Sequence, residues 1–139
     1  MAAYLFNEAG RPDLTQKWAR WIMDNKYGDG YGGLDGNDDA GTLSAWYVFS
    51  ALGFYPMAGS DRYQLGAPLF EKAEVKLKNK PLVITAENYA TNHFYAQKVW
   101  LNDRPLERTW ISHGEITQGG TLKFVMGPKP ARTQTVEAR

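Results

Sequence analysis

The hydrophobic residues change their spacing once along this chain, close to Pro56, and that change limits the possible folds more than any other feature. Before it, large apolar residues recur at helical spacing, most clearly over residues 14–22. After it, charged and aliphatic residues alternate over residues 74–78, which is the period of a half-buried strand. A helical part over residues 1–56 followed by an antiparallel β part over residues 57–128 makes this an α+β chain.

Two helices are predicted in the first part. Gly10 ends the opening segment and Pro12 starts a helix, because proline is favoured at a first helical position. This helix is predicted to be amphipathic and packed on one side. Its apolar residues are Leu14, Trp18, Trp21 and Ile22. The second helix, Thr42–Leu52, is apolar almost all round, so we expect it to be buried on most faces, and Gly53 fits a left-handed stop after it.

The β part consists of short apolar segments separated by turn residues. Turn signals that recur about every 8 to 12 residues are typical of a sandwich of antiparallel sheets. The predicted strands are residues 62–65, 74–78, 82–85, 98–101, 105–107, 109–111 and 121–126. Residues 129–139 form a polar tail that we expect to be flexible.

The composition excludes several kinds of site. The 139 residues suit one domain or two small ones, and a hydrophobic content of 43% is enough for a core. The absence of cysteine excludes disulfides, a thiolate zinc site and a cysteine nucleophile. The net charge of +1 gives no reason to expect nucleic acid as a partner. No apolar run reaches the roughly 18 residues of a membrane span. No signal peptide is visible, and residues 1–6 resemble the inside of a helix, as expected of a piece of a longer protein.

A glycine-rich acidic segment between the two helices is the best candidate for a functional site. Residues 27–41 hold six of the 14 glycines, which lets the backbone form turns that other residues cannot. Carboxylates at the start of a helix feel its partial positive charge and stay ionised. An ionised carboxylate suits a general base or a metal ligand, whereas a general acid needs a raised pKa. The four acidic residues are Asp29, Asp35, Asp38 and Asp39.

Simpler explanations exist for the same residues. Asp38 or Asp39 could serve only as the N-cap of the helix that follows. The spacing of the aspartates does not match an EF-hand calcium loop, because no glutamate occupies the twelfth position. His93 and His113 lie far apart in the sequence and are predicted to be hydrogen-bonding residues rather than metal ligands. Trp100 and Trp110 could stack on a sugar, but they fit core positions better.

The longest motif resembles a known enzyme family. Residues 36–50 read Gly-Asn-Asp-Asp-Ala-Gly-Thr-Leu-Ser-Ala-Trp-Tyr-Val-Phe-Ser and are followed by Ala-Leu-Gly-Phe-Tyr-Pro. This block is similar to the signature near the end of the α-mannosidases of glycoside hydrolase family 92. The likeness continues through residues 63–70, 111–113 and 119–128. It implies an exo-acting, calcium-dependent, inverting glycosidase of which this chain is a C-terminal fragment. The chain would supply the last helices of an (α/α)6 barrel and a β-sandwich-like portion.

The resemblance assigns roles to three residues of the motif. Asp39 matches the carboxylate taken as the general base, which activates the attacking water. Many members carry an aspartate where this chain has Asn37, so Asn37 is given a supporting role. Asp38 occupies the acidic middle position of the motif, and the resemblance assigns it no definite role. The general acid lies upstream in the family, outside this chain, and the resemblance does not place the calcium ligands on residues of this chain.

The resemblance also implies partners and a compartment. The substrates would be mannose-containing glycans, and the N-terminal part of the enzyme would be the main protein partner. The location would be periplasmic or extracellular. Exposed apolar faces could also cause self-association. Without the general acid, we expect the isolated chain to be almost inactive. The alternative function is a non-catalytic carbohydrate-binding or structural β-sandwich module, which exposed aromatic residues in the β part would favour.

Overall fold

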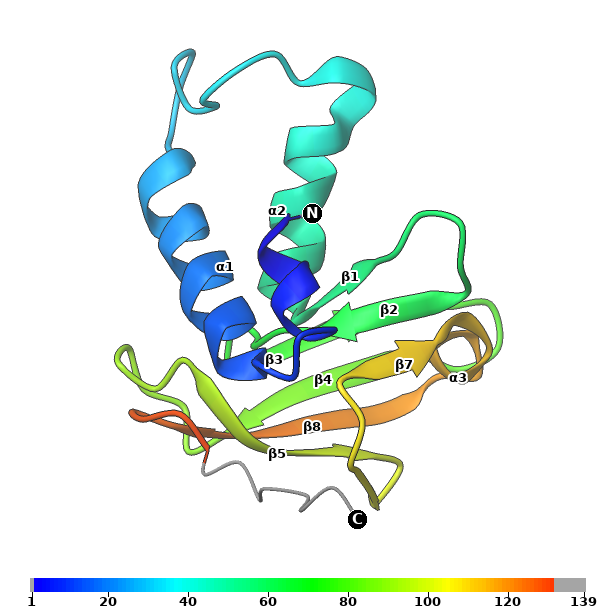
Figure 1. The fold of residues 1–139 in the computed structure, drawn as a ribbon. Coiled ribbons are helices and arrows are strands. Elements are labelled where there is room, and N and C mark those ends of the chain that lie inside the picture. Colours follow the sequence, from blue (N-terminus) through cyan, green and yellow to red (C-terminus); the bar gives the residue numbers. More distant parts are fainter. Residues whose placement is uncertain (1, 132–139) are drawn as a thin grey trace.

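The computed structural model describes residues 2–131 and places a group of helices above a layered β part (Figure 1). The helical elements are η1 (Ala2–Phe6), α1 (Pro12–Lys26), η2 (Asp39–Gly41), α2 (Thr42–Leu52) and α3 (His113–Thr117). The strands are β1 (Phe54–Pro56), β2 (Arg62–Leu65), β3 (Lys72–Val75), β4 (Leu82–Glu87), β5 (Tyr95–Leu101), β6 (Arg104–Leu106), β7 (Trp110–Ser112) and β8 (Gly120–Gly127). The α+β class predicted from the change in periodicity is confirmed.

Helix α1 begins at the predicted proline but buries a different face from the one predicted. Thr15, Ala19 and Met23 are buried, and they follow one another at the four-residue spacing of a helix face. Trp18 and Trp21 remain 39% and 45% exposed. The helix is packed on one side, but two of its large apolar residues lie outside the packed face. The small Ala19 side chain lets α1 approach its neighbours, while the two indoles are only partly covered by the described residues.

Helix α2 has the predicted bounds but is less buried than expected. Trp46, Ser50 and Ala51 are buried, whereas Val48 is 57% exposed. Gly53 has a φ of 95°, and its N–H donates to the carbonyls of Phe49 and Ser50, so the helix ends in the left-handed stop that was predicted. The expectation of burial on most faces is wrong because, within residues 2–131, only part of the helix surface has neighbours.

The strands form two sheets that share one core. The smaller sheet has the order β1-β2-β7, and the larger has the order β3-β4-β8-β5-β6. All pairings are antiparallel except β4 with β8, which is parallel. The core between them contains Phe54 and Ile111 from the smaller sheet, and Ile84, Leu122 and Phe124 from the larger. The two-sheet arrangement agrees with the predicted sandwich, and the parallel pair is an addition to it.

Besides the short η2, two elements were not predicted. Phe54–Pro56, at the end of the predicted helical part, forms β1 and pairs with β2. Helix α3 follows β7 and begins with a capping box: the Ser112 hydroxyl accepts from the Glu115 N–H, and the Glu115 carboxylate accepts from the Ser112 N–H at 2.8 Å. Burial tends to raise the pKa of Glu115, but hydrogen bonds from Ser112 and Arg108 outweigh this effect and lower it. The Ser-x-x-Glu spacing was a readable signal for this helix.

Buried polar contacts join the helices to the sheets. The Asn7 amide donates to the Gln64 side chain at 3.0 Å and to the Leu65 carbonyl at 2.8 Å. The side-chain Oε1 of Gln16 in α1 accepts from the backbone N–H of Ala96 in β5 at 3.1 Å. Because unpaired buried polar groups are costly, these contacts fix how the helices sit on the β part. The division at residue 56 stays a prediction, and most of the predicted tail, residues 132–139, lies outside the described residues.

Candidate active site

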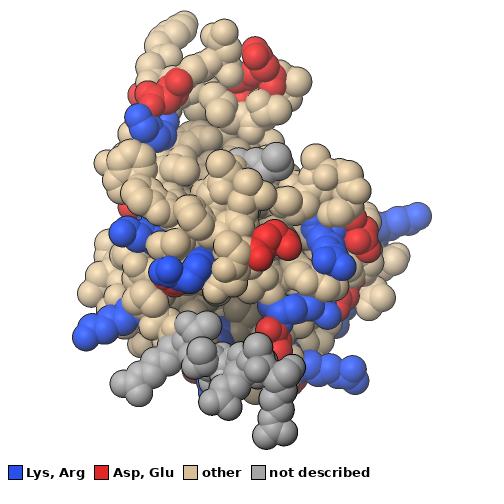
Figure 2. All heavy atoms as spheres, in the orientation of Figure 1, with Lys and Arg blue, Asp and Glu red and all other residues tan. Residues whose placement is uncertain are grey.

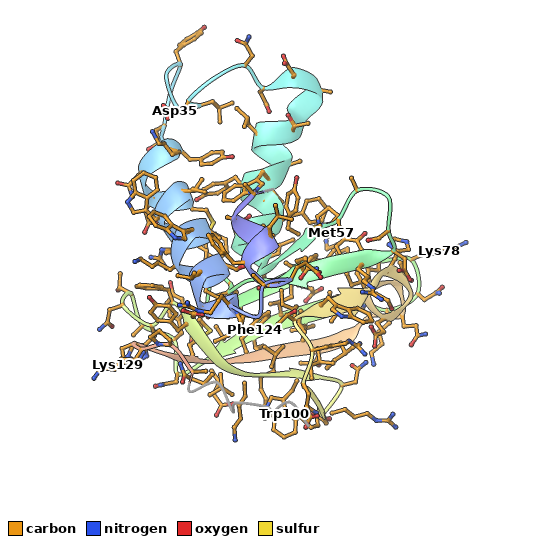
Figure 3. The ribbon with its side chains drawn as sticks, in the orientation of Figure 1. Asp35, Met57, Lys78, Trp100, Phe124 and Lys129 are labelled. Carbon is orange, nitrogen blue, oxygen red and sulfur yellow. The ribbon has the colours of Figure 1, made fainter. Side chains whose placement is uncertain are left out.

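The acidic segment lies between α1 and α2, at the end of the helices that is far from the sheets (Figure 1). Figure 3 shows Asp35 there, with Trp100 at the opposite end of the molecule. Tyr27 and Leu34 form an isolated antiparallel bridge that closes the base of the loop. An ion pair of 2.6 Å between Lys26 and Asp35 ties the loop to the end of α1. In the space-filling view, acidic side chains gather over this end of the molecule (Figure 2).

One glycine of this loop is required by the close approach of the backbone. The Gly28 N–H donates to the Gly33 carbonyl at 2.9 Å, and the Gly33 N–H donates to the Gly30 carbonyl at 3.1 Å. A Cβ atom at Gly33 would lie only 2.1 Å from the Gly28 carbonyl oxygen. No side chain therefore fits at position 33 unless the turn opens.

Replacing Gly33 by alanine is expected to open the turn and release the bridge between Tyr27 and Leu34. The matched control is Gly36→Ala, because a Cβ atom at Gly36 meets nothing within 4 Å. Backbone amide chemical shifts over residues 27–36 should change strongly in the first variant and only next to the substitution in the second. Equal and purely local changes in both variants would contradict the close contact in the structure.

The N-cap residue of α2 is Gly41, but the side chain of Asp38 does the capping by accepting hydrogen bonds from the first turn of the helix. The Asp38 Oδ1 accepts from the backbone N–H of Leu43 at 2.8 Å and of Ser44 at 3.0 Å, and its Oδ2 accepts from the Ser44 hydroxyl. The hydrogen bond from the Ser44 hydroxyl, followed by that from the Ser44 N–H, lowers the pKa of Asp38 below its usual value. The capping explanation thus applies to Asp38, and its carboxylate is kept ionised as predicted for an acid at a helix start.

Asp39 is not needed for the cap. Its side chain is exposed and forms no hydrogen bond or ion pair among residues 2–131, although its backbone carbonyl accepts from Thr42. Ala40 and Gly41 then adopt left-handed φ values of 53° and 75°. Such a φ is unusual for alanine and turns the backbone sharply between Asp39 and the first residue of α2. The two neighbouring carboxylates thus differ in their contacts: that of Asp38 binds the start of the helix, and that of Asp39 is open to solvent. Asn37 is also exposed and has no side-chain partner in the same range.

A hollow of about 450 Å³ lies beside this segment, between the glycine-rich loop and α2. Tyr27 and Tyr47 provide its aromatic walls, and Asp29 and Ser44 provide polar groups. Ser44 also binds Asp38, so the hollow borders the acidic motif. The sequence analysis singled out Asp29 as one of the four aspartates of the segment, but nothing in the sequence indicated that Tyr27 and Tyr47 line a hollow beside it.

The remaining candidates have ordinary structural partners. His93 Nδ1 lies 2.8 Å from the Asn88 carbonyl, and His113 Nδ1 lies 3.0 Å from the Tyr63 hydroxyl. Among residues 2–131, no three histidine or acidic side chains converge as a cation site would require. The guanidinium groups of Arg62 and Arg108 lie 4.2 and 4.4 Å from the centre of the Trp110 ring, so the indole has two cationic partners within the chain.

Comparison with known proteins identifies the chain. Residues 1–128 match the family model described as the glycosyl hydrolase family 92 catalytic domain. The chain belongs to glycosyl hydrolase family 92. This finding confirms the resemblance carried by residues 36–56 and by the motifs in the β part. Within the part of the chain that the structure describes, no helix is long and apolar enough to span a membrane.

Several family 92 proteins are similar to this chain over most of its length. An α-mannosidase of Bacteroides thetaiotaomicron, solved in complex with mannoimidazole, has 38% identity and a TM-score of 0.87, covering 92% of this chain and 17% of that protein. An inverting mannosidase from strain VPI-5482 of the same species has 40% identity and a TM-score of 0.85, covering 93% and 18%. A protein of Arthroderma benhamiae described as an uncharacterized secreted glycosidase has 31% identity over 131 residues, covering 91% and 17%. The chain thus spans about one-sixth of the length of these relatives.

Proposed function

We propose that this segment is part of the active site of an exo-acting α-mannosidase that hydrolyses α-mannosides with inversion, and that Asp39 is its general base. The proposal rests on the different contacts of two neighbouring aspartates. Asp38 uses both carboxylate oxygens to hold the start of α2, whereas Asp39 is exposed and has no side-chain partner among residues 2–131. The α-mannosidase and mannosidase names of the similar solved structures support the reaction class.

The chemistry requires little from this segment beyond a positioned carboxylate. In an inverting glycosidase, one carboxylate removes a proton from water as the water attacks the anomeric carbon, while a carboxylic acid protonates the leaving oxygen. These two groups lie about 6.5–9.5 Å apart, with room for the water between them. Asp39 would take the first role, and the Asn37 amide would orient the water. The acid would come from the rest of the enzyme.

The environment of Asp39 suits a base. It follows a carboxylate that stays ionised because of its hydrogen bonds, and it precedes a left-handed turn at Ala40. Strained backbone of this kind often accompanies functional residues. The exposed Asp39 carboxylate, with no side-chain partner among residues 2–131, is therefore free to contact an attacking water.

Calcium is part of the proposal for the whole enzyme and not for this segment alone. Calcium takes six to eight oxygen ligands, and within residues 2–131 no three acidic or histidine side chains converge. The described residues do not fit a complete calcium site, so we assign no step of the reaction to the ion here.

For the whole protein we also propose mannose-containing glycans as substrates and an extracellular or periplasmic location. The secreted relative in A. benhamiae supports export.

The proposal is tested by the release of an aryl leaving group from an α-mannoside. We expect no turnover by the 139-residue chain and clear turnover by a full-length family 92 enzyme that carries this segment, with inversion detected by NMR of the first-formed anomer. Turnover by the chain alone that is abolished by Asp39→Ala would show that the site is complete without the rest of the enzyme. Release with retention, or no turnover by the full-length enzyme, would contradict the proposal.

A further inference from the structure

We infer that the hollow between the glycine-rich loop and α2 is a sugar subsite, and that Asp29 is the carboxylate that binds the hydroxyl groups of the sugar. The inference rests on the proposed function, since it makes the hollow a part of the same active site. Its volume of about 450 Å³ lies within the range of roughly 300–1,000 Å³ that is common for small-ligand pockets.

The aromatic walls of the hollow are fixed before any ligand binds. The Tyr27 hydroxyl donates to the Leu43 carbonyl at 2.8 Å, and the Tyr27 ring stacks on Trp46 with 5.8 Å between ring centres. Tyr47 lies 4.9 Å from Tyr27, with its ring tilted by 47°. Rings that are already held in place lose little conformational entropy on binding. They offer apolar surface to the C–H groups of a pyranose ring.

The polar groups disfavour an anionic ligand and suit one that is rich in hydroxyl groups. Asp29 lines the hollow and forms no hydrogen bond or ion pair among residues 2–131, so its oxygens are available as acceptors. The nearby Lys26 is already paired with Asp35 and does not offset this charge. A carboxylate repels anionic ligands but accepts hydrogen bonds from two neighbouring hydroxyls at once. Aromatic walls with one such carboxylate therefore fit a neutral sugar.

The hollow is continuous with the acidic motif. Ser44 lines it, and the hydroxyl of the same residue donates to Asp38, which precedes Asp39 in the chain. A sugar held in the hollow would therefore lie next to the segment that carries the proposed base. Asp29 is a binding residue in this arrangement, and it is not required to exchange a proton.

The test compares binding with turnover in a full-length family 92 enzyme that carries this segment. Mannose affinity is measured by calorimetry, and kcat and KM are measured with an aryl α-mannoside. Asp29→Asn is expected to weaken mannose binding by about 10–100-fold, because a hydrogen bond to a charged group is lost. It should raise KM and leave kcat nearly unchanged, as removal of uniform binding does. Tyr47→Ala, which removes one wall, should also weaken binding.

The matched control is Asp35→Asn, which removes the same charge from the same loop at a residue that does not line the hollow. It is expected to leave kcat unchanged and to weaken affinity much less than Asp29→Asn does, because it releases Lys26 but leaves the Asp29 carboxylate in the hollow. If neither Asp29→Asn nor Tyr47→Ala weakens mannose binding while Asp39→Asn abolishes turnover, the subsite is wrong and the proposed function stands. If Asp39→Asn retains full turnover while Asp29→Asn weakens binding, the proposed base is wrong and the hollow remains a sugar site.

Discussion

Replacing Asp39 by asparagine in a full-length family 92 enzyme that carries this segment is expected to lower kcat by about 10²–10⁴-fold, the usual contribution of a general base. The amide keeps the size of the side chain but cannot accept a proton from water. Mannose affinity should change little, because Asp29, rather than Asp39, lines the neighbouring hollow. Steady-state kinetics with an aryl α-mannoside, together with mannose calorimetry, measures both effects. The acidic limb of the pH profile of kcat/KM, which reports the essential base, should disappear in the variant.

Two neighbouring substitutions sharpen this test. Asp35→Asn removes a charge from the same loop and should leave kcat unchanged. Asp38→Asn is expected to cause a much smaller loss than Asp39→Asn, because asparagine is also a good helix cap and can still accept from the N–H groups of Leu43 and Ser44. A loss at Asp38 as large as that at Asp39 would contradict the division between a capping and a reacting carboxylate, and it would move the base to Asp38.

Much of the helical part could be predicted because its boundaries are set by local chemistry. Proline starts α1, and a glycine with a left-handed φ ends α2. The turn at Asn102 and Asp103, both with positive φ, likewise follows from residues that tolerate this conformation. These signals lie within a few residues of the structure they specify. For the same reason, the Ser-x-x-Glu spacing of the capping box could have predicted the start of α3 from the sequence.

The buried faces and the strand pairing could not be predicted in the same way. Trp18, Trp21 and Val48 are apolar, yet they are exposed within the described part of the chain. Hydrophobic spacing shows that such residues need a partner, but it does not show where the partner lies. The parallel pairing of β4 with β8 joins residues about 38 positions apart, such as Leu82 and Gly120, and no local signal specifies it. Pairings of this kind depend on the whole core.

The sequence singled out the candidate segment, which stays a prediction, and the structure was needed to distinguish the contacts of its aspartates. The sequence left open whether Asp38 or Asp39 caps the helix, since both lie close to its start. The left-handed turn at Ala40 and Gly41 decides this, because it leaves the Asp38 carboxylate facing the N–H groups of α2. Alanine is not a typical residue for such a turn, so composition gave no indication of it. The hollow likewise depends on Tyr27 and Tyr47, which come from either side of the loop.

Replacing Tyr4 by alanine is expected to destabilise the chain by about 3–5 kcal/mol, the usual cost of deleting a buried aromatic side chain. Tyr4 is completely buried. Its ring stacks on Tyr55 at 5.2 Å and meets Trp46 edge-on at 6.3 Å, and its hydroxyl donates to the Ser50 hydroxyl at 2.9 Å. This one side chain of η1 therefore joins α2 to the strand that follows it. Burial also raises the pKa of Tyr4, so the phenol stays neutral over the whole physiological range.

The measurement is urea unfolding of the chain followed by far-UV circular dichroism. Tyr4→Phe should cost less, about 1–3 kcal/mol, because it keeps the ring and removes only the hydrogen bond to Ser50. Tyr31→Ala is the control: Tyr31 is fully exposed in the glycine-rich loop, and a surface substitution of this kind usually changes stability by less than about 0.5 kcal/mol. An unfolding midpoint in Tyr4→Ala as high as in Tyr31→Ala would mean that η1 is not packed between the helices and the β part. In that case η1 would pack in this position only in the presence of the rest of the enzyme.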